Sequence, residues 1–393
     1  MAEKWRNWSG KLTARPERLH FVRSEPDAVA VVVRAAAEGA GIRTAGSSHS
    51  HSPLLPTDGV IVDTSGLNGV ISTDAATSRA WVWAGTPIHA LGQPLQLAGL
   101  ALTNQGDIDR QTIAGAAGTG THGTGLALTN LSAAVTGAHM ALASGELVRC
   151  SASERSDLWR VAQLSLGAVG LVTRLELQLR DAYRLRQDGW QEQLDPLLER
   201  VAELTRQHRH FEFFWHPTTD ECVAKATDET DDPPEYPIGD EGARCGWNYE
   251  VLPSHRNWLH TEMEYSVPAE AGPACLTAIR ELLRREFPTM PYPVEYRTVA
   301  PDDVWLSPAN DRPTVTISVH VAVGDDDEPL FRACEAIFRT FGGRPHWGKV
   351  HYLTGTELAG DSPHWDDWWG VRDSHDPDGI FLNEHLRSLQ RPS

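Results

Sequence analysis

The feature that most constrains this 393-residue chain is a glycine-rich segment, GAAGTGTHGTG, which runs from Gly115 to Gly125. Five glycines within eleven residues are costly in backbone entropy, so we expect the backbone there to approach another group closely and to direct N–H donors at it. A phosphate is the natural guest for such a loop. From this segment alone, a tight glycine-rich connection without a ligand is the alternative.

Residues 118–123 also satisfy the GxGxxG pattern of dinucleotide-binding proteins. That pattern is informative only between a buried strand and an apolar helix. The preceding NQGDIDRQTIAGAA does not have the character of a buried strand, and no apolar helix follows Gly125. A nicotinamide-binding Rossmann domain is therefore disfavoured, and a nicotinamide-dependent dehydrogenase stays only as a rival class.

A second loop, AGSSHSHSPLLPTDG over residues 45–59, follows a strand-like IRTA segment. Its small residues and free N–H groups suit a pyrophosphate, and two anion-binding loops in one domain indicate a dinucleotide. His49 and His51 could ligate a metal in isolation, but no carboxylate, Cys or His partner stands at ligand spacing. We therefore predict polar surface histidines and no metal.

Charge and composition exclude other classes. The net charge is −18 and Lys and Arg form no run, which argues against nucleic-acid binding. The N-terminus has no apolar signal region, and no stretch of eighteen apolar residues occurs, so we predict a cytoplasmic protein without a membrane span. The five cysteines are scattered and lack a CxxC pair, which predicts buried, reduced thiols.

Hydrophobic patterning predicts two units with a boundary near residue 182. In the first, Ser24 caps a helix that continues to Ala37, and the alternation of residues 171–179 marks a last strand. In the second, a helix capped by Asp195, a strand at 211–215 and a helix at 270–287 indicate helices packed on an antiparallel sheet. The acidic, proline-containing segment 228–241 is predicted to be a solvated loop.

Six motifs stand in a characteristic order along residues 43–385: AGSSHS, TIAGAAGTGTHGTG, SLGAVGLVTRLEL, VEYR, RPHWGKVH and DPDGIFLN. In this order the chain resembles the aldono-1,4-lactone oxidase and alditol oxidase group of FAD-linked oxidoreductases, within the vanillyl-alcohol oxidase superfamily. The resemblance implies an α+β fold. A PCMH-type FAD-binding domain would cover residues 1–182, completed by 344–393, and an α/β cap domain with an antiparallel sheet would cover 183–343.

The resemblance also implies the cofactor and its contacts. His49 matches the family histidine that is bonded covalently to the 8α-methyl group of FAD, whereas His51 does not. The cofactor-binding residues implied in this way are Arg43, Ala45, Gly46, Ser47, Ser48, His49, Ser50, Thr112, Gly115, Gly118, Gly120, Thr121, His122, Gly170, Val172 and His346.

The substrate side is expected from the second unit. Glu295 and Arg297 stand two residues apart in a strand-like run and emerge on one face, which suits a hydroxyl clamp or, from the residues alone, an exposed ion pair. The resemblance implies that these two and Lys349 are catalytic. Thr112 and His320 join these three as the implied substrate contacts, and together with His346 we expect a locally cationic pocket.

The implied reaction is oxidation of a hydroxyl group of an aldono-1,4-lactone or alditol by hydride transfer to FAD, with dioxygen as acceptor and hydrogen peroxide as product. A dehydrogenase with another electron acceptor, or an enzyme acting on a specialised sugar-containing metabolite, is the nearest alternative. A zinc hydrolase and a non-catalytic sugar-binding module are rivals from other classes.

Overall fold

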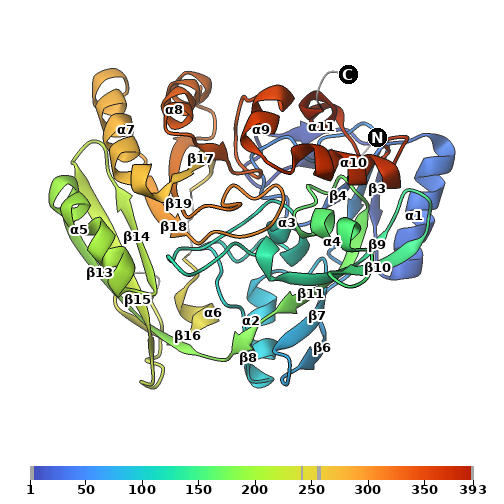
Figure 1. Ribbon diagram of the computed structural model, residues 1–393, viewed down its shortest axis with the longest axis horizontal. Helices are drawn as coiled ribbons and strands as arrows, with labels where there is room; N and C mark the ends of the chain where they lie inside the picture. Colours follow the sequence, from blue (N-terminus) through green and yellow to red (C-terminus); the bar gives the residue numbers. More distant parts are fainter. Residues whose placement is uncertain (1–3, 240–241, 255–257, 391–393) are drawn as a thin grey trace.

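The computed structural model describes residues 4–239, 242–254 and 258–390, and its strands gather in separate sheets (Figure 1). A three-stranded parallel sheet runs in the order β3 (Arg18–Phe21), β5 (Val60–Asp63) and β4 (Ile42–Ala45). A five-stranded antiparallel sheet has the order β10 (Leu147–Ser151), β9 (Val135–Ala141), β11 (Leu171–Gln178), β7 (Arg79–Trp83) and β6 (Val70–Asp74). Two short pairs, β1 (Trp5–Arg6) with β2 (Thr13–Ala14) and β8 (Leu100–Ala101) with β12 (Arg180–Asp181), complete this N-terminal region.

Helices cover the N-terminal sheets, and the first of them begins and ends where the sequence predicts. Their bounds are α1 (Glu25–Glu38), α2 (His89–Leu97), α3 (Ile113–Ala117) and α4 (Ser156–Gln163), with a 3-10 turn at Ser132–Ala134. At the start of α1 the Ser24 side chain accepts a hydrogen bond from the Asp27 N–H, and Gly39 ends the helix with a positive φ of 65°. The predicted helix is therefore confirmed at both ends.

An eight-stranded antiparallel sheet, here called the cap sheet, dominates the second region. Its order is β16 (Arg244–Trp247), β13 (Arg184–Gln193), β15 (Glu221–Thr230), β14 (His210–Trp215), β18 (Val294–Val299), β19 (Thr314–Ala322), β17 (His260–Pro268) and β20 (Arg344–Pro345). Its helices are α5 (Leu194–Gln207), α6 (Asn248–Val251), α7 (Gly272–Glu286) and α8 (Glu328–Thr340), with a 3-10 turn at Ala269–Ala271.

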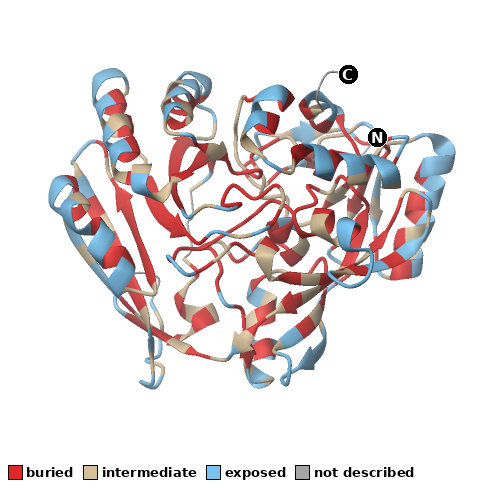
Figure 2. Cartoon of the chain, in the orientation of Figure 1, coloured by how far each residue is buried: buried red, intermediate tan, exposed pale blue. Residues whose placement is uncertain are grey.

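The cap sheet is buried on both faces in its central strands. Figure 1 shows α5 and α7 on the outer side of the sheet, and Figure 2 shows the central strands red along their length while these helices expose their outer faces. The outward face carries apolar side chains such as Phe213, Tyr296 and Ile317, which belong to the main hydrophobic core. The opposite face must therefore satisfy its own polar groups within the protein.

The chain returns to the N-terminal region through α9 (Gly355–Asp361), α10 (Trp365–His375) and α11 (Glu384–Leu389), drawn in red in Figure 1. The Trp368 indole donates to the Leu164 carbonyl at 3.1 Å, and Arg372 Nε donates to the Ala168 carbonyl at 3.1 Å. The strands change sheet between β12 and β13, and β20 still pairs with β17. The predicted domain limits at 182 and 344 remain predictions.

Two local predictions are wrong. Helix α5 begins at Leu194 after an extended Gln193, so Asp195 lies in the first turn instead of capping it. The acidic segment is only partly a loop, because Asp228 and Glu229 lie in β15, where Glu229 pairs with Arg180. Its last two residues, 240 and 241, lie outside the described residues.

The cysteines and the search for a membrane span can also be compared with the sequence predictions. All five cysteines are buried and free, as predicted. Within the described ranges, no helix combines the length and the apolar character that a bilayer span requires.

Candidate active site

A cavity lies in the N-terminal region. It is enclosed by the loop after β4, the segment that leads into α3, and the start of β11. The predicted cofactor residues that line it are Arg43, Gly46, Ser47, Ser48, His49, Ser50, Thr112, Gly115, Gly118, Gly170 and Val172. The two glycine-containing loops, which are about 65 residues apart in the sequence, therefore face one space.

The glycines of this cavity are needed for close backbone packing. A Cβ on Gly46 would collide with the Thr112 side chain, and one on Gly118 would lie 2.8 Å from the Ala114 carbonyl oxygen. The two loops consequently approach each other to within a distance that a side chain would prevent. The glycines shape the cavity wall in addition to offering N–H donors to a ligand.

Several polar atoms of the cavity wall suit a bound dinucleotide. Thr44 Oγ1 and Gln111 Oε1 are buried, line the cavity and make no hydrogen bond to any residue that the structure describes. Buried polar atoms without a partner are costly, so a ligand with many hydrogen-bonding groups fits this wall. The Arg43 guanidinium donates to the carbonyls of Leu54, Leu166, Gly167 and Phe381, which accounts for four of its five N–H groups among the described residues.

Five predicted cofactor residues do not line the cavity: Ala45, Gly120, Thr121, His122 and His346. Ala45 packs in a small apolar cluster with Trp5 and Ile61. His122 instead turns to the cap sheet, where its Nε2 lies 2.7 Å from Glu264 Oε1. His122 Nδ1 lies 2.8 Å from the Gly123 carbonyl oxygen, so both ring nitrogens face acceptors.

The face of the cap sheet opposite its helices is polar. Every second residue of a strand points to the same side of the sheet. On β17 these residues are His260, Glu262 and Glu264, and the register places Glu262 opposite His320 and Glu264 opposite Ser318 on β19. Ser318 lies opposite Glu295 on β18 in turn. A buried row of polar side chains therefore crosses three strands.

Arg297 is the centre of one buried group of charges. Its Nε donates to Glu212 Oε2 at 2.6 Å, and its NH2 lies 3.0 Å from Asp107 Oδ1 and pairs with Glu295 Oε1. Burial opposes the charged guanidinium, but the carboxylates raise the pKa of Arg297 well above its ordinary value. The predicted Glu295–Arg297 pair exists, and it is buried instead of exposed.

Lys349 lies at a second group, which we call the Glu262 cluster: His51, His260, Glu262, His320 and Lys349. The Lys349 ammonium pairs with Glu262 Oε2, and 21% of its side-chain surface is exposed. Three imidazole Nε2 atoms surround the carboxylate, His51 at 3.9 Å and His260 at 3.6 Å from Oε2, and His320 at 3.7 Å from Oε1. The charges of Lys349 and His320 keep the pKa of Glu262 well below its ordinary value, against the effect of burial.

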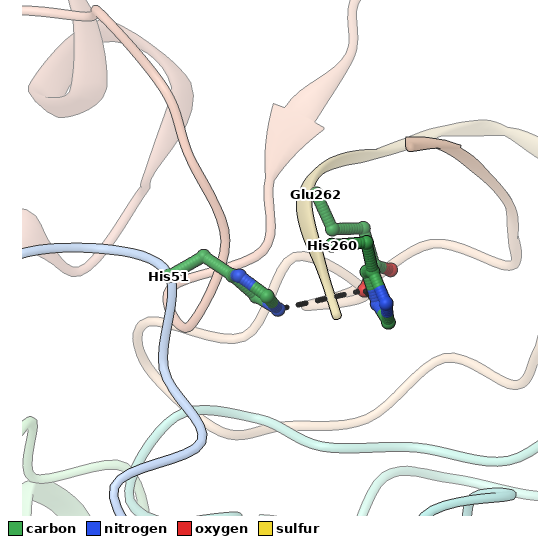
Figure 3. Close-up of side chains that lie close together, drawn as sticks. All are labelled: His51, His260 and Glu262. Atoms are coloured by element: carbon green, nitrogen blue, oxygen red, sulfur yellow. Dashed lines mark ion pairs between the residues drawn. The ribbon is translucent and has the colours of Figure 1, made fainter. Parts of the chain in front are cut away.

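The prediction that His51 is a surface residue is wrong. Only 8% of His51 is exposed, and Figure 3 shows its ring reaching from its loop toward His260 and Glu262 on β17. The three residues place ligand atoms within 4.8 Å of one another. Spacing in the sequence could not reveal this, since more than 200 residues separate the loop from β17.

The Glu262 cluster borders the cavity through a few contacts. The His51 N–H donates to the Gly348 carbonyl at 2.7 Å, next to Lys349. The Trp8 ring stacks on His49 at 5.4 Å and meets His260 edge-on at 5.2 Å. Because His49 lines the cavity, the cavity and the polar face of the cap sheet belong to one site.

The expectation of a locally cationic pocket is wrong. In the part of the chain that the structure describes, Arg297 and Lys349 are each held by buried carboxylates, and burial lowers the pKa of His346 to about 4. The site is a mixed network of opposite charges, as expected where ionised groups are removed from water.

Sequence reasoning missed Asp107, Glu212, His260, Glu262 and Glu264. The segment HTEMEYSVP carries a usable signal, because its polar residues at 260, 262, 264 and 266 alternate with Met263, Tyr265 and Val267. Such alternation normally marks a strand with one face in water. Nothing in the segment says that the polar face is buried.

A family model described as D-arabinono-1,4-lactone oxidase matches residues 175–248 and 235–389, and an FAD binding domain model matches residues 16–151. The chain belongs to the D-arabinono-1,4-lactone oxidase family. It is an FAD-dependent oxidoreductase of the aldonolactone oxidase and alditol oxidase group, which confirms the resemblance read from the motifs.

Relatives match along nearly the whole chain. The chain is 34% identical to L-gulono-1,4-lactone dehydrogenase of Mycobacterium tuberculosis, with all of both chains covered. It is 24% identical to L-gulonolactone oxidase of Bos taurus and 29% identical to alditol oxidase of a Streptomyces species, with 98% of each chain covered in both cases.

Solved structures share the fold. A solvent-stable cholesterol oxidase superposes with a TM-score of 0.86 at 19% identity, covering 98% of this chain and 97% of that one. A 6-hydroxy-D-nicotine oxidase of Arthrobacter nicotinovorans superposes with a TM-score of 0.78 at 18% identity, covering 100% and 98%. The predicted α+β fold with a PCMH-type FAD-binding domain and an antiparallel cap sheet is confirmed.

Proposed function

We propose that this enzyme oxidises a hydroxyl group of an aldono-1,4-lactone or an alditol, with FAD held in the cavity of the N-terminal region. The observation that carries the proposal is the junction of that cavity with the polar face of the cap sheet, where the Trp8 ring contacts both His49 of the cavity wall and His260 of the cap sheet. Bound FAD supplies the chemistry by taking up the hydrogen of a C–H bond with its two electrons. The names of the relatives, which specify sugar lactones and alditols, support the substrate class.

Within this proposal, Glu295 accepts hydrogen bonds from substrate hydroxyls, and Lys349 and Arg297 favour the alkoxide that develops during oxidation. Lys349 is the better placed of the two cations, since part of its side chain is exposed while Arg297 is held by three carboxylates. Thr112 and His320 are proposed to contact the substrate from opposite sides, because one lines the cavity and the other belongs to the Glu262 cluster.

We also propose that His49 is bonded to the 8α-methyl group of the flavin. Burial, with the nearby charge of Lys349, lowers the pKa of His49 to about 4, so its imidazole is neutral at pH 7 and can form a bond to carbon. Acid precipitation tests the link. Yellow colour should stay with the precipitated wild-type protein and pass to the supernatant in His49→Ala; colour in the wild-type supernatant would contradict the link.

The electron acceptor is proposed to be dioxygen, with hydrogen peroxide as product. The relative that is 34% identical is named a dehydrogenase, so transfer to another acceptor is the second candidate. Peroxide formation and dye reduction, measured side by side with one lactone, distinguish the two.

Anaerobic mixing with a panel of lactones and alditols tests the reaction itself. Bleaching of the flavin absorbance near ~450 nm identifies a substrate. Lys349→Met should slow this bleaching by about tenfold or more while leaving FAD bound, because a charge near the developing alkoxide is lost. A wild-type flavin that no polyol or lactone bleaches would refute the proposed function.

A further inference from the structure

Oxidation of an alcohol releases a proton as well as a hydride, and the sequence motifs name no group to receive that proton. The Glu262 cluster holds several imidazoles, and His260 is the member packed between Trp8 and Trp258, with ring centroids 5.2 Å and 4.6 Å away. His260 also shares the Glu262 Oε2 atom with the Lys349 ammonium. The cation proposed to bind the alkoxide and the His260 ring therefore meet at one oxygen.

Both ring nitrogens of His260 face hydrogen-bond acceptors. Nδ1 lies 3.3 Å from the Trp258 carbonyl oxygen, so the neutral tautomer that donates to this carbonyl carries its proton on Nδ1. The Nε2 atom of the neutral ring then holds a lone pair, 3.6 Å from Glu262 Oε2. Two lone pairs repel at this distance, whereas a protonated Nε2 would form an ion pair with the carboxylate.

We propose that His260, supported by Glu262, is the group that accepts the proton of the substrate hydroxyl. The inference rests on the proposed function. As the carbonyl forms, the O–H proton passes to His260 Nε2, the C–H hydrogen leaves as hydride to the oxidant FAD, and the ring becomes an imidazolium that Glu262 stabilises. The proton passes to solvent after product leaves, which restores the neutral ring.

The neighbours of His260 fit this role. The titratable and charged groups that face it are His49 and His51 from the loop after β4, Glu262 on its own strand, His320 on β19 and Lys349 from the turn after β20. Burial and the Lys349 charge lower the pKa of His51 well below the ordinary value, which makes His51 a poor proton acceptor. The same groups could ligate a divalent cation, but the Lys349 ammonium already pairs with the oxygen that such an ion would need.

The test is the pH dependence of anaerobic flavin reduction by L-gulono-1,4-lactone in the FAD-loaded protein. The wild-type rate should rise with pH through one ionisation, as the ring loses its proton. In His260→Gln the rate should fall by about a hundredfold or more and the pH step should disappear. Added imidazole should restore part of the rate in His260→Ala. Glu262→Gln should also slow the reduction, because the imidazolium that forms loses its counter-ion.

His320→Gln is the matched control, because His320 also faces Glu262 and also places Nδ1 near a carbonyl, that of Pro293 at 3.0 Å. Because His320 is itself proposed to contact the substrate, the rate of this variant should fall, but the pH step should remain. Loss of the step in His320→Gln, or its persistence with a rate within about threefold of wild type in His260→Gln, would overturn the assignment. Flavin absorbance and circular dichroism show whether each variant is folded and loaded.

Nitrogen-15 NMR of histidine-labelled protein gives a readout that needs no turnover. The resonance that disappears in His260→Gln should show the Nδ1–H form of the neutral ring, and the Nε2–H form would refute the proposal. If no sugar substrate reduces the flavin of the wild-type protein, both the proposed function and this inference are refuted. If a substrate reduces the wild-type flavin and His260→Gln is reduced at the same rate, only this inference is refuted.

Discussion

The cavity of the N-terminal region and the polar face of the cap sheet are built in opposite ways. The cavity wall consists of glycines, small hydroxyl residues and backbone groups drawn from two loops and the start of β11. The polar face consists of ionisable side chains from β14, β17, β18 and β19, which meet only because the strands pair in one register. Close backbone packing therefore forms the first region, and the pairing of opposite charges stabilises the second.

This difference says how each region should respond to change. An added methyl group is harmful where backbones pack closely, while a lost charge is harmful where its partner stays buried. The following predictions test that contrast, and the expected effects decrease in order.

Arg297→Met should lower the free energy of unfolding by about 3–5 kcal/mol, because it leaves Asp107, Glu212 and Glu295 buried without their shared cation. Urea denaturation measures the change. Arg332→Met is the control, since Arg332 pairs with Glu328 on the surface, and it should leave the urea midpoint unchanged. Equal effects of the two substitutions would mean that burial does not determine how much these ion pairs contribute to the free energy of unfolding.

Gly46→Ala should reduce FAD content by about tenfold or more, because the new Cβ collides with Thr112 and pushes the two cavity loops apart. The ratio of flavin to protein absorbance measures the content. Gly370→Ala offers a matched control, since a Cβ there meets no atom of the described residues within 4 Å. Full FAD content in Gly46→Ala would show that the loops need not touch.

The His122–Glu264 pair joins the two regions and should make stability depend on pH. Despite burial, Glu264 raises the pKa of His122 above its ordinary value of 6.5. A group whose pKa is raised by folding contributes fully below its unfolded pKa, and the contribution is lost as pH rises through the folded value. The pair therefore stabilises most near pH 6 and less in alkali.

Glu264→Gln should accordingly lower the free energy of unfolding by about 1.5–3 kcal/mol near pH 6 and by less near pH 9. Urea denaturation at both pH values measures this. Ser318→Ala is the control, because Ser318 donates to the same carboxylate at 2.7 Å without carrying charge, and its effect should not change with pH. A pH-independent effect of Glu264→Gln would contradict an ionised pair.

Asp232→Asn should have the smallest effect. Asp232 pairs with Arg186 in the acidic segment, where 58% of its side-chain surface is exposed. Solvent screens such a pair, so the melting temperature should stay within about 1 °C and FAD content should not change. A clear loss of either would show that this segment supports the site.

Much of the N-terminal region could be read from the sequence. Ser24 and Gly39 bound a helix, the alternation of residues 171–179 marks β11, and the two glycine-containing loops line the cavity as their composition predicts. These features depend on neighbours within a few residues, since capping, alternation and backbone freedom are local properties. The family resemblance, which the comparisons confirm, added FAD and the expected contacts.

The contacts on the polar face of the cap sheet could be identified only from the tertiary structure. The sequence identified Glu295, Arg297, His320 and Lys349, but not the carboxylates and histidines that surround them. Those neighbours come from separate segments of the chain, and only strand register and the placement of the N-terminal loops bring them together. The sequence by itself determined the shape of a dinucleotide cavity, whereas the tertiary structure decided which charges face each other, because electrostatic pairing depends on distance in space and not along the chain.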